Sequence, residues 1–190
     1  MRKLIVAIDT QVDFMMRNGR LPVSFAHAFI SPGIEYLTSL NKDEVAGVLF
    51  TYDTHGPEYE GSEESKLFGL HCEKGTPGWE NVFNPKLIDR DIAVFTLEKT
   101  VFNMWEESNL KVQDEDGDMV DREFFFEEMK KHVDTVVIFG VASDFCVKWA
   151  IDGFIERGFN VEVIQHLTKG INQQINEVLE DPKYANVVLV

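Results

Sequence analysis

Residues 140–146, with the sequence GVASDFC, are the stretch of this chain most suggestive of chemistry. They follow a run of strand-forming residues at 135–139 and precede an amphipathic helical pattern. A cysteine at the start of a helix lies among free backbone N–H groups, at the positive end of the helix dipole. The thiol of Cys146 is therefore expected to ionise easily and to act as a nucleophile, with the N–H groups stabilising an oxyanion. The alternative is a buried cysteine that only fills space under a sheet.

Three other runs of strand character end in polar side chains that would suit such a nucleophile. The residues that follow or end these runs are Asp9, Asp53 with His55, and Lys99. Each has an ordinary alternative: a turn or cap for the acids, a solvated charge for the lysine. Carboxyl ends of parallel strands lie at one edge of a sheet, where α/β proteins bind their ligands. Convergence of all four strand ends on one edge therefore predicts an active site there.

The segment after the second strand has the composition of a metal site. Asp53 and His55 fall on the same side of an extended chain, and His71 follows after a long acidic loop. Histidines combined with carboxylates suit a borderline divalent metal such as zinc, manganese or iron. The alternative is that Asp53 and His55 only hydrogen-bond to the backbone of the loop.

The apolar runs alternate with helical patterns, which predicts a parallel sheet covered on both faces and joined by right-handed crossovers. Strands are expected at 4–8, 45–51, 92–97, 135–139, 161–164 and 187–190. Helices are expected at 26–40, 123–132, 144–157 and 171–180. The predicted fold is a three-layer α/β/α sandwich around a central, mainly parallel sheet of about six strands, formed by one domain that spans residues 1–190.

Two segments interrupt the alternation. Residues 54–85 form a long stretch punctuated by glycine and proline, and a loop of this length in a compact domain is usually functional. Residues 102–122 contain an acidic run at 114–118. This run lacks the terminal glutamate and flanking helices of a calcium loop, so a solvated turn is expected.

Charge and length limit the classes of partner. A net charge of −15 argues against nucleic acid and against an anionic membrane surface. No apolar run approaches the length of a membrane span, and the N-terminus has no signal-peptide pattern. Two cysteines, Cys72 and Cys146, do not make a disulfide framework, so a cytoplasmic setting is expected.

The chain resembles the nicotinamidase/pyrazinamidase branch of the isochorismatase-like cysteine hydrolases. The resemblance covers nearly the whole chain, and the family pattern occurs in order. Its parts here are Asp9-Thr10-Gln11-Val12-Asp13-Phe14, Asp53-Thr54-His55, His71 to Gly78, Lys99-Thr100, and Gly140 to Cys146.

The resemblance implies a catalytic triad of Asp9 as proton acceptor, Lys99 as electrostatic partner and Cys146 as nucleophile. It also implies a cis peptide bond between Val141 and Ala142. The backbone N–H groups of Ala142 and Cys146 would then face the oxyanion.

The resemblance further implies one divalent metal ion, expected to be zinc, with iron or manganese as alternatives. Asp53, His55 and His71 match its ligands. The remaining ligand is a glutamate, and Glu64 fits the spacing best among Glu60, Glu63 and Glu64. Three aromatic residues are candidates to hold a flat substrate ring, namely Phe14, Phe68 and Trp105.

The implied activity is metal-assisted hydrolysis of nicotinamide to nicotinate and ammonia through a thioester, as part of NAD salvage and pyridine nucleotide biosynthesis. The alternatives are a related amidase or carbamoyl hydrolase acting on another small amide, and a non-catalytic metal- or ligand-binding relative. A homo-oligomer is expected by analogy with the family.

Overall fold

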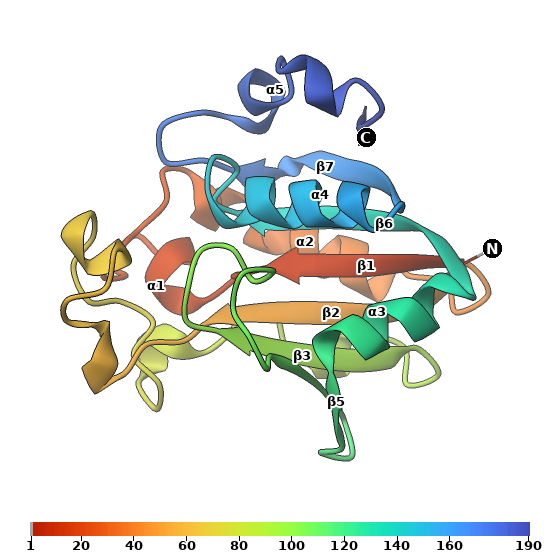
Figure 1. Ribbon diagram of the computed structural model, residues 1–190, viewed down its shortest axis with the longest axis horizontal. Coiled ribbons are helices and arrows are strands. Elements are labelled where there is room, and N and C mark those ends of the chain that lie inside the picture. Colours follow the sequence, from red (N-terminus) through yellow and green to blue (C-terminus); the bar gives the residue numbers. More distant parts are fainter. Residues whose placement is uncertain (1) are drawn as a thin grey trace.

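The computed structural model describes residues 2–190, which form an eight-stranded sheet in the order β5-β4-β3-β2-β1-β6-β7-β8 (Figure 1). The strands are β1 (Arg2–Ile8), β2 (Val45–Asp53), β3 (Ala93–Lys99), β4 (Lys111–Asp114), β5 (Met119–Asp121), β6 (Val133–Val141), β7 (Asn160–Lys169) and β8 (Val188–Leu189). The helices are α1 (Val12–Met15), α2 (Ile30–Thr38), α3 (Arg122–Lys130), α4 (Cys146–Glu156) and α5 (Ile175–Val178).

Alternate residues of the central strand β1 belong to two different cores. Leu4, Val6 and Ile8 pack in the core that includes residues of α3, α4 and α5. Ile5 and Ala7 pack in the core that includes residues of α1 and α2. Side chains of a strand point alternately to opposite faces, so the sheet lies between two helical layers. The predicted α/β/α architecture with its mainly parallel sheet is confirmed.

The two strands beyond the predicted six form a hairpin at one edge of the sheet. β4 pairs antiparallel with both β3 and β5, and the acidic run at 114–118 makes the turn between β4 and β5. All three residues of β5 are exposed, and the strand is too short to show an apolar pattern, although Met119 and Val120 are apolar. Its formation depends on hydrogen-bonded pairing with β4 rather than on burial, which explains why hydrophobic patterning did not predict it.

The helix predicted at 171–180 is wrong for most of its length, since only Ile175–Val178 is helical. The carboxylate of Asp144 accepts hydrogen bonds from the N–H groups of Ile171, Asn172 and Gln173, at 2.9, 2.7 and 3.2 Å. These contacts fix the three residues in a loop, and the helix begins only after them. Similarly, the helix predicted at 26–40 consists of a 3₁₀ turn at Ala26–Phe29 followed by α2.

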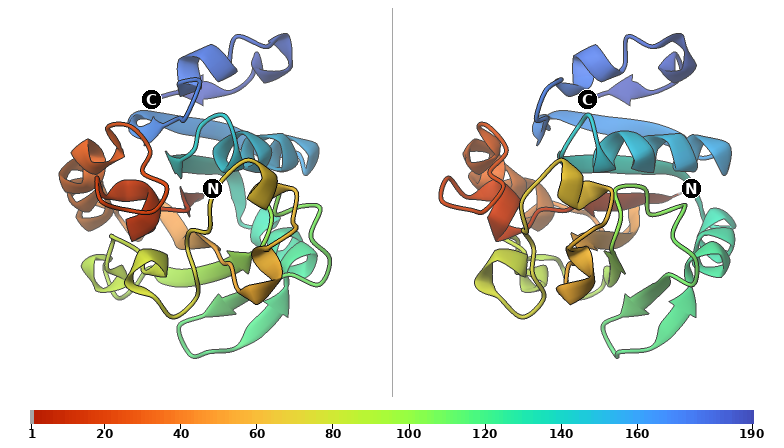
Figure 2. Two further views of the ribbon diagram at one scale, coloured as in Figure 1. Left: turned by 90° about the vertical axis from the view of Figure 1, so that its left-hand side faces the viewer. Right: turned by 60° about the vertical axis from the view of Figure 1, so that its left-hand side comes forward.

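The carboxyl ends of β1, β2, β3 and β6 lie at one edge of the sheet, next to the long segment between β2 and β3 (Figure 2). This segment contains only short 3₁₀ turns, at Pro57–Tyr59, Glu64–Lys66, Pro77–Trp79 and Pro85–Leu87. None of the helices within residues 2–190 has the length and apolar character needed to cross a bilayer. The fold therefore gathers four strand ends and one long loop at a single edge.

Candidate active site

Lys99 connects the polar side chains at this edge. Its Nζ lies 2.8 Å from Oδ2 of Asp9, 3.2 Å from Oδ1 of Asp53 and 3.4 Å from Sγ of Cys146. Lys99 is 2 % exposed, and both carboxylates are buried as well. A buried ammonium keeps its charge only beside compensating anions. Burial lowers the pKa of Lys99, but Asp53 and Asp9 outweigh burial and raise it well above the ordinary value.

Asp9 is the proton acceptor that this arrangement supports. The hydroxyl of Thr51 donates to Oδ1 of Asp9 at 2.6 Å and accepts from the Asp9 N–H at 3.1 Å. Burial raises the pKa of Asp9, whereas Lys99 and the Thr51 hydroxyl lower it, and the net effect is a raised pKa. A raised pKa makes Asp9 a stronger base towards a thiol than an exposed aspartate would be.

The expectation that Cys146 ionises easily is not met by its surroundings. Cys146 is the first residue of α4, as the predicted helix start required, but it is only 7 % exposed. Burial raises the pKa of its thiol well above the ordinary value, and the lowering by Lys99 does not compensate. The thiol therefore carries its proton at rest and depends on a base to remove it.

The turn before Cys146 presents backbone N–H groups beside the sulfur. The Val141–Ala142 peptide bond is cis. The carbonyl of Ala142 accepts from the N–H groups of Phe145 and Val147, and the N–H of Cys146 has no backbone acceptor among residues 2–190. The N–H of Ala142 likewise has no such acceptor, so both N–H groups can donate to an oxyanion.

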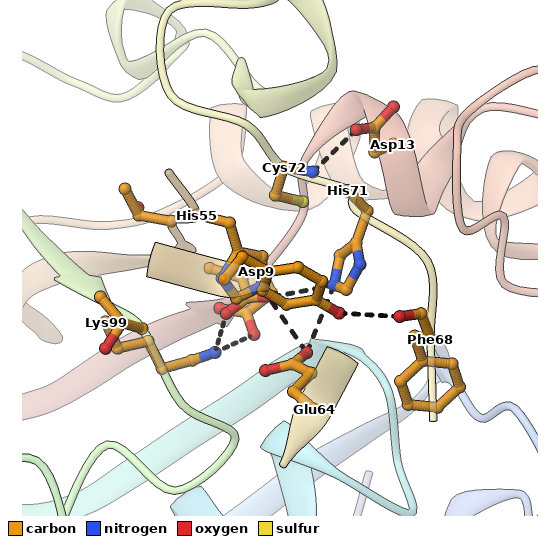
Figure 3. A network of polar contacts seen from close by, with 12 residues as sticks. Asp9, Asp13, His55, Glu64, Phe68, His71, Cys72 and Lys99 are labelled. Carbon is orange, nitrogen blue, oxygen red and sulfur yellow. Dashed lines mark hydrogen bonds and ion pairs between the residues drawn. The ribbon is translucent and has the colours of Figure 1, made fainter. Parts of the chain in front are cut away.

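Four buried side chains form the second half of the site: Asp53, His55, Glu64 and His71. One ligand atom of each lies within 4.8 Å of the others. Nε2 of His55 is 3.0 Å and Nε2 of His71 is 3.1 Å from Oδ2 of Asp53, and Oε1 of Glu64 is 3.3 Å from Nε2 of His71. Figure 3 shows His55, Glu64 and His71 converging, with the ammonium of Lys99 beside them.

The donor atoms of this group fit a divalent cation. Nδ1 of His71 lies 2.8 Å from the carbonyl of Gly69, which accepts only, so Nδ1 carries the proton and Nε2 offers a lone pair in the neutral ring. That lone pair faces the carboxylates of Asp53 and Glu64, which repel it unless a proton or cation lies between them. Oε2 of Glu64 is buried without a hydrogen-bond partner among the described residues. Two imidazoles and two carboxylates suit zinc, iron or manganese.

The charges of the cluster show the same need for a cation. Burial lowers the pKa of His71, but hydrogen bonds with Asp53 and Glu64 raise it to about 10 overall. The pKa of His55 is raised in the same direction by the same two carboxylates against its burial. Burial would raise the pKa of Asp53, yet Lys99 and the two histidines hold it well below its usual range. Without a metal, protons on the histidines take its place.

Glu64 is the only one of the three candidate glutamates that the structure brings to the cluster. Glu60 and Glu63 are exposed, and Glu63 pairs with Lys66 at the surface. Glu64 begins a 3₁₀ turn that directs its side chain inward, where it is 5 % exposed.

Gln11 and Asp13 make positioning contacts that were not predicted from the sequence. The side-chain amide of Gln11 donates to the carbonyl of Asp53 and accepts from its N–H, both at 2.8 Å. These two bonds fix the backbone of Asp53, a candidate metal ligand. Asp13 accepts from the N–H of Cys72 at 2.8 Å and so fixes the residue next to His71. The signal was their place in the motif that begins with Asp9.

The pocket over Cys146 is lined mainly by apolar side chains. Its lining comprises Phe14, Leu21, Glu64, Phe68, Phe102, Val141, Ala142, Phe145, Cys146 and Ile171. The structure therefore brings Phe14 and Phe68 to the pocket, as predicted, but not Trp105, which packs against Phe126 and Phe154. Phe102 and Phe145 were missed because aromatic residues in loops give no pattern that separates a pocket wall from ordinary packing.

Comparisons with known proteins agree with this geometry. Residues 3–178 match the model of the isochorismatase domain family. The chain is 23 % identical to a nicotinamidase of Saccharomyces cerevisiae, with 99 % of each chain covered. It is 28 % identical to a nicotinamidase/pyrazinamidase of Mycobacterium tuberculosis, covering 100 % of this chain and 98 % of the relative.

Solved structures give the same fold. A zinc complex of the pyrazinamidase of Pyrococcus horikoshii has a TM-score of 0.75 at 23 % identity, covering 100 % of this chain and 99 % of the other. A pyrazinamidase/nicotinamidase of Streptococcus mutans has a TM-score of 0.73 at 25 % identity, with 99 % of both chains covered.

Proposed function

The chain belongs to the isochorismatase family as a nicotinamidase-like amidohydrolase, and on this premise we propose that it hydrolyses nicotinamide to nicotinate and ammonia. The observation that carries the proposal is the position of Lys99. Its ammonium lies within 3.4 Å of the buried carboxylate of Asp9, the buried thiol of Cys146 and the carboxylate of Asp53, which also belongs to the candidate metal site. One cation thus holds a nucleophile and its base beside a substrate-anchoring site.

The proposed reaction has two halves, both served by Asp9. Asp9 takes the proton of Cys146 as the sulfur attacks the amide carbon, and the N–H groups of Ala142 and Cys146 stabilise the oxyanion. The C–N bond breaks as Asp9 returns the proton to the leaving ammonia, which leaves a thioester. Asp9 then takes a proton from water, the hydroxide adds to the thioester, and C–S cleavage releases nicotinic acid, which loses its proton to solvent to give nicotinate. The thiolate of Cys146 recovers its proton from Asp9.

A metal ion would be held by Asp53, His55, Glu64 and His71, and zinc is our first assignment, with iron or manganese as the alternatives. When bound, it would anchor the ring nitrogen of the substrate and withdraw electrons from the ring. The side chains themselves orient the substrate. Phe14 and Phe68 border the pocket, and aromatic rings can stack on a flat heteroaromatic substrate.

The lining of the pocket favours a neutral substrate over an anionic one. Glu64 is the only charged side chain in the lining, and it is negative. Lys99, the nearest cation, is committed to Asp9 and Asp53. A substrate that carries carboxylates, as isochorismate does, would find no free cation in this lining. Another small neutral amide is the alternative substrate.

The experiment measures ammonia release from nicotinamide by the purified protein as isolated, after chelation, after metal is restored, and with Cys146→Ala. We expect release that falls on chelation, returns with metal and is absent in the variant. No release from nicotinamide or pyrazinamide by metal-loaded protein with a reactive Cys146 would exclude this substrate and favour another amide. Metal binding with an unreactive thiol would favour a non-catalytic binding protein.

In the cell, production of nicotinate places the proposed reaction in NAD salvage and pyridine nucleotide biosynthesis. We propose that residues 1–190 act as one domain in a cytoplasmic homo-oligomer, with a small amide as partner and no nucleic acid or membrane. The net charge of −15 supports the last part, because both of those surfaces are anionic.

A further inference from the structure

One wall of the pocket comes from the segment between β3 and β4, residues 100–110, through Phe102. The ring of Phe102 lies 5.3 Å from that of Phe145 and 6.1 Å from that of Phe68, measured between centroids. All three rings border the cavity over Cys146. That cavity has a volume of about 20 Å³, which is room for a single water molecule. A pyridine ring therefore enters only if a wall yields, and the firmness of each wall becomes a determinant of substrate binding.

Trp105, three residues after Phe102, is held between α3 and α4. Its Nε1–H donates to the carbonyl of Trp149 at 3.1 Å. The guanidinium of Arg157 lies 3.8 Å from the centroid of the indole. The rings of Phe126 and Phe154 lie 5.1 Å from it. The indole is thus gripped by contacts that have nothing to do with the pocket itself.

Gly153 is the feature of α4 that makes room for the indole. A Cβ at position 153 would lie 2.0 Å from Nε1 and 2.2 Å from Cδ1 of Trp105. Glycine in a helix interior is destabilising by about 0.5–1 kcal/mol relative to alanine. Gly153 lies well inside Cys146–Glu156, and its absent side chain is explained by the close approach of Trp105.

We propose that Trp105 is a positioning residue that sets the width of the pocket over Cys146, by anchoring segment 100–110 to α4 through the contact with Gly153. α4 begins at Cys146 and segment 100–110 carries Phe102, so the Trp105–Gly153 contact fixes one pocket wall relative to the nucleophile. Segment 100–110 is the firm wall, and entry of the ring depends on movement of the long β2–β3 segment, which carries Phe68. The inference rests on the proposed function only in taking Cys146 as the nucleophile.

The first test measures how fast Cys146 reacts with iodoacetamide and with the larger N-ethylmaleimide, using Cys146→Ala to subtract any reaction of Cys72. Gly153→Ala expels the indole, and Trp105→Phe removes the hydrogen bond while keeping an aromatic ring. Each should speed alkylation by roughly threefold to tenfold, the range that corresponds to one lost hydrogen bond. The alkylation rate should increase more for N-ethylmaleimide than for iodoacetamide, because a wider pocket removes more steric hindrance for the larger reagent.

A double mutant separates the contact from general damage to the helix. In a Trp105→Ala background the Gly153→Ala change meets no indole, so it should have no further effect on alkylation. Trp149→Phe and Glu156→Ala are the controls on α4. The first changes the indole of Trp149, whose hydrogen bond with Trp105 is made by its backbone carbonyl and is therefore kept. The second changes an exposed residue. Both variants should be alkylated at the rate of the unmodified protein.

Nicotinamide kinetics provide the second readout. In Gly153→Ala we expect KM to fall by roughly threefold to tenfold, because less binding energy is spent on moving a wall, while kcat changes less because the chemical groups stay in place. Alkylation rates within twofold of the unmodified protein in both Gly153→Ala and Trp105→Phe, together with a lowered melting temperature, would overturn the proposal and leave Trp105 a packing residue. The alkylation result stands whether or not nicotinamide is the substrate, so the two proposals fail separately.

Discussion

The catalytic half and the metal half of this site are held in place by different means. Asp9, Lys99 and Cys146 lie where strands β1 and β3 end and where α4 begins. His55, Glu64 and His71 belong to the long segment between β2 and β3, which contains only 3₁₀ turns. One half therefore depends on the sheet, and the other depends on a loop.

Sheet register alone aligns much of the catalytic half. Asp53 at the end of β2 is the register partner of Lys99 at the end of β3, and Ile8, next to Asp9, is the partner of Gly140. The loop half is instead fixed by single hydrogen bonds. For example, the carbonyl of Gly69 accepts one from His71, and the carboxylate of Asp13 accepts one from the N–H of Cys72. Loss of one such bond disorders a loop residue more than a strand residue, because the neighbouring strands also hold the strand residue in place.

Asp53 belongs to both halves. Its Oδ1 faces Lys99 and its Oδ2 faces the two histidines. We therefore expect changes on the catalytic side to abolish turnover without emptying the metal site, whereas changes in the loop should weaken metal binding and leave the nucleophile in place.

The largest effect is expected from Cys146→Ala. Turnover should fall by about a thousandfold or more, because the thioester can no longer form. Binding of zinc, followed by calorimetry, should match the unmodified protein, since no metal-type ligand is altered. Weakened zinc binding in this variant would show that the two halves are not separable.

Lys99→Met should be the most destabilising change at the site. It leaves Asp9 and Asp53 buried without their cation, and breaking a buried pair costs about 3–5 kcal/mol. Urea unfolding measures the loss, and turnover should fall as well because the pKa values of both acids rise without Lys99. Lys148→Met is the matched control. It breaks a partly exposed pair with Asp152 and should cost about 1 kcal/mol or less; an equal cost would contradict the central role of Lys99.

Glu64→Gln tests the loop half. We expect zinc affinity to fall by about a hundredfold, because a charged ligand becomes neutral at nearly constant volume. KM for nicotinamide should rise, and added zinc should restore activity. Glu63→Gln, one residue away and exposed, is the control. If the two variants bind zinc equally well, another residue completes the ligand set.

The same division explains what could be predicted from the sequence. Apolar runs that end in Asp9, Lys99 and the turn before Cys146 predicted their convergence, because the geometry of a parallel sheet is regular. The position of Glu64 required the family pattern, since a loop with several glutamates has no periodicity. Trp105 was predicted to line the pocket but lies outside it. The prediction failed because the sequence does not distinguish an aromatic residue that lines a pocket from one that packs elsewhere in the same segment. Burial, which raises the pKa of Cys146, is also invisible until the core is built.

The smallest effect should come from Thr51→Val, which sharpens the account of Asp9 as the base. The Thr51 hydroxyl donates to Oδ1 of Asp9 at 2.6 Å, and this bond stabilises the ionised carboxylate. Its loss adds to the raising of the Asp9 pKa by burial. Asp9 must be ionised to take the thiol proton, so the acid limb of the kcat/KM profile should move to higher pH, with the rate on that limb lower by up to about tenfold. Thr168→Val, which removes a buried hydroxyl bonded to the carbonyl of Ile164, should leave the profile in place. A Thr51→Val profile that is lower at every pH without a shift would mean that Asp9 is not the group titrating in catalysis.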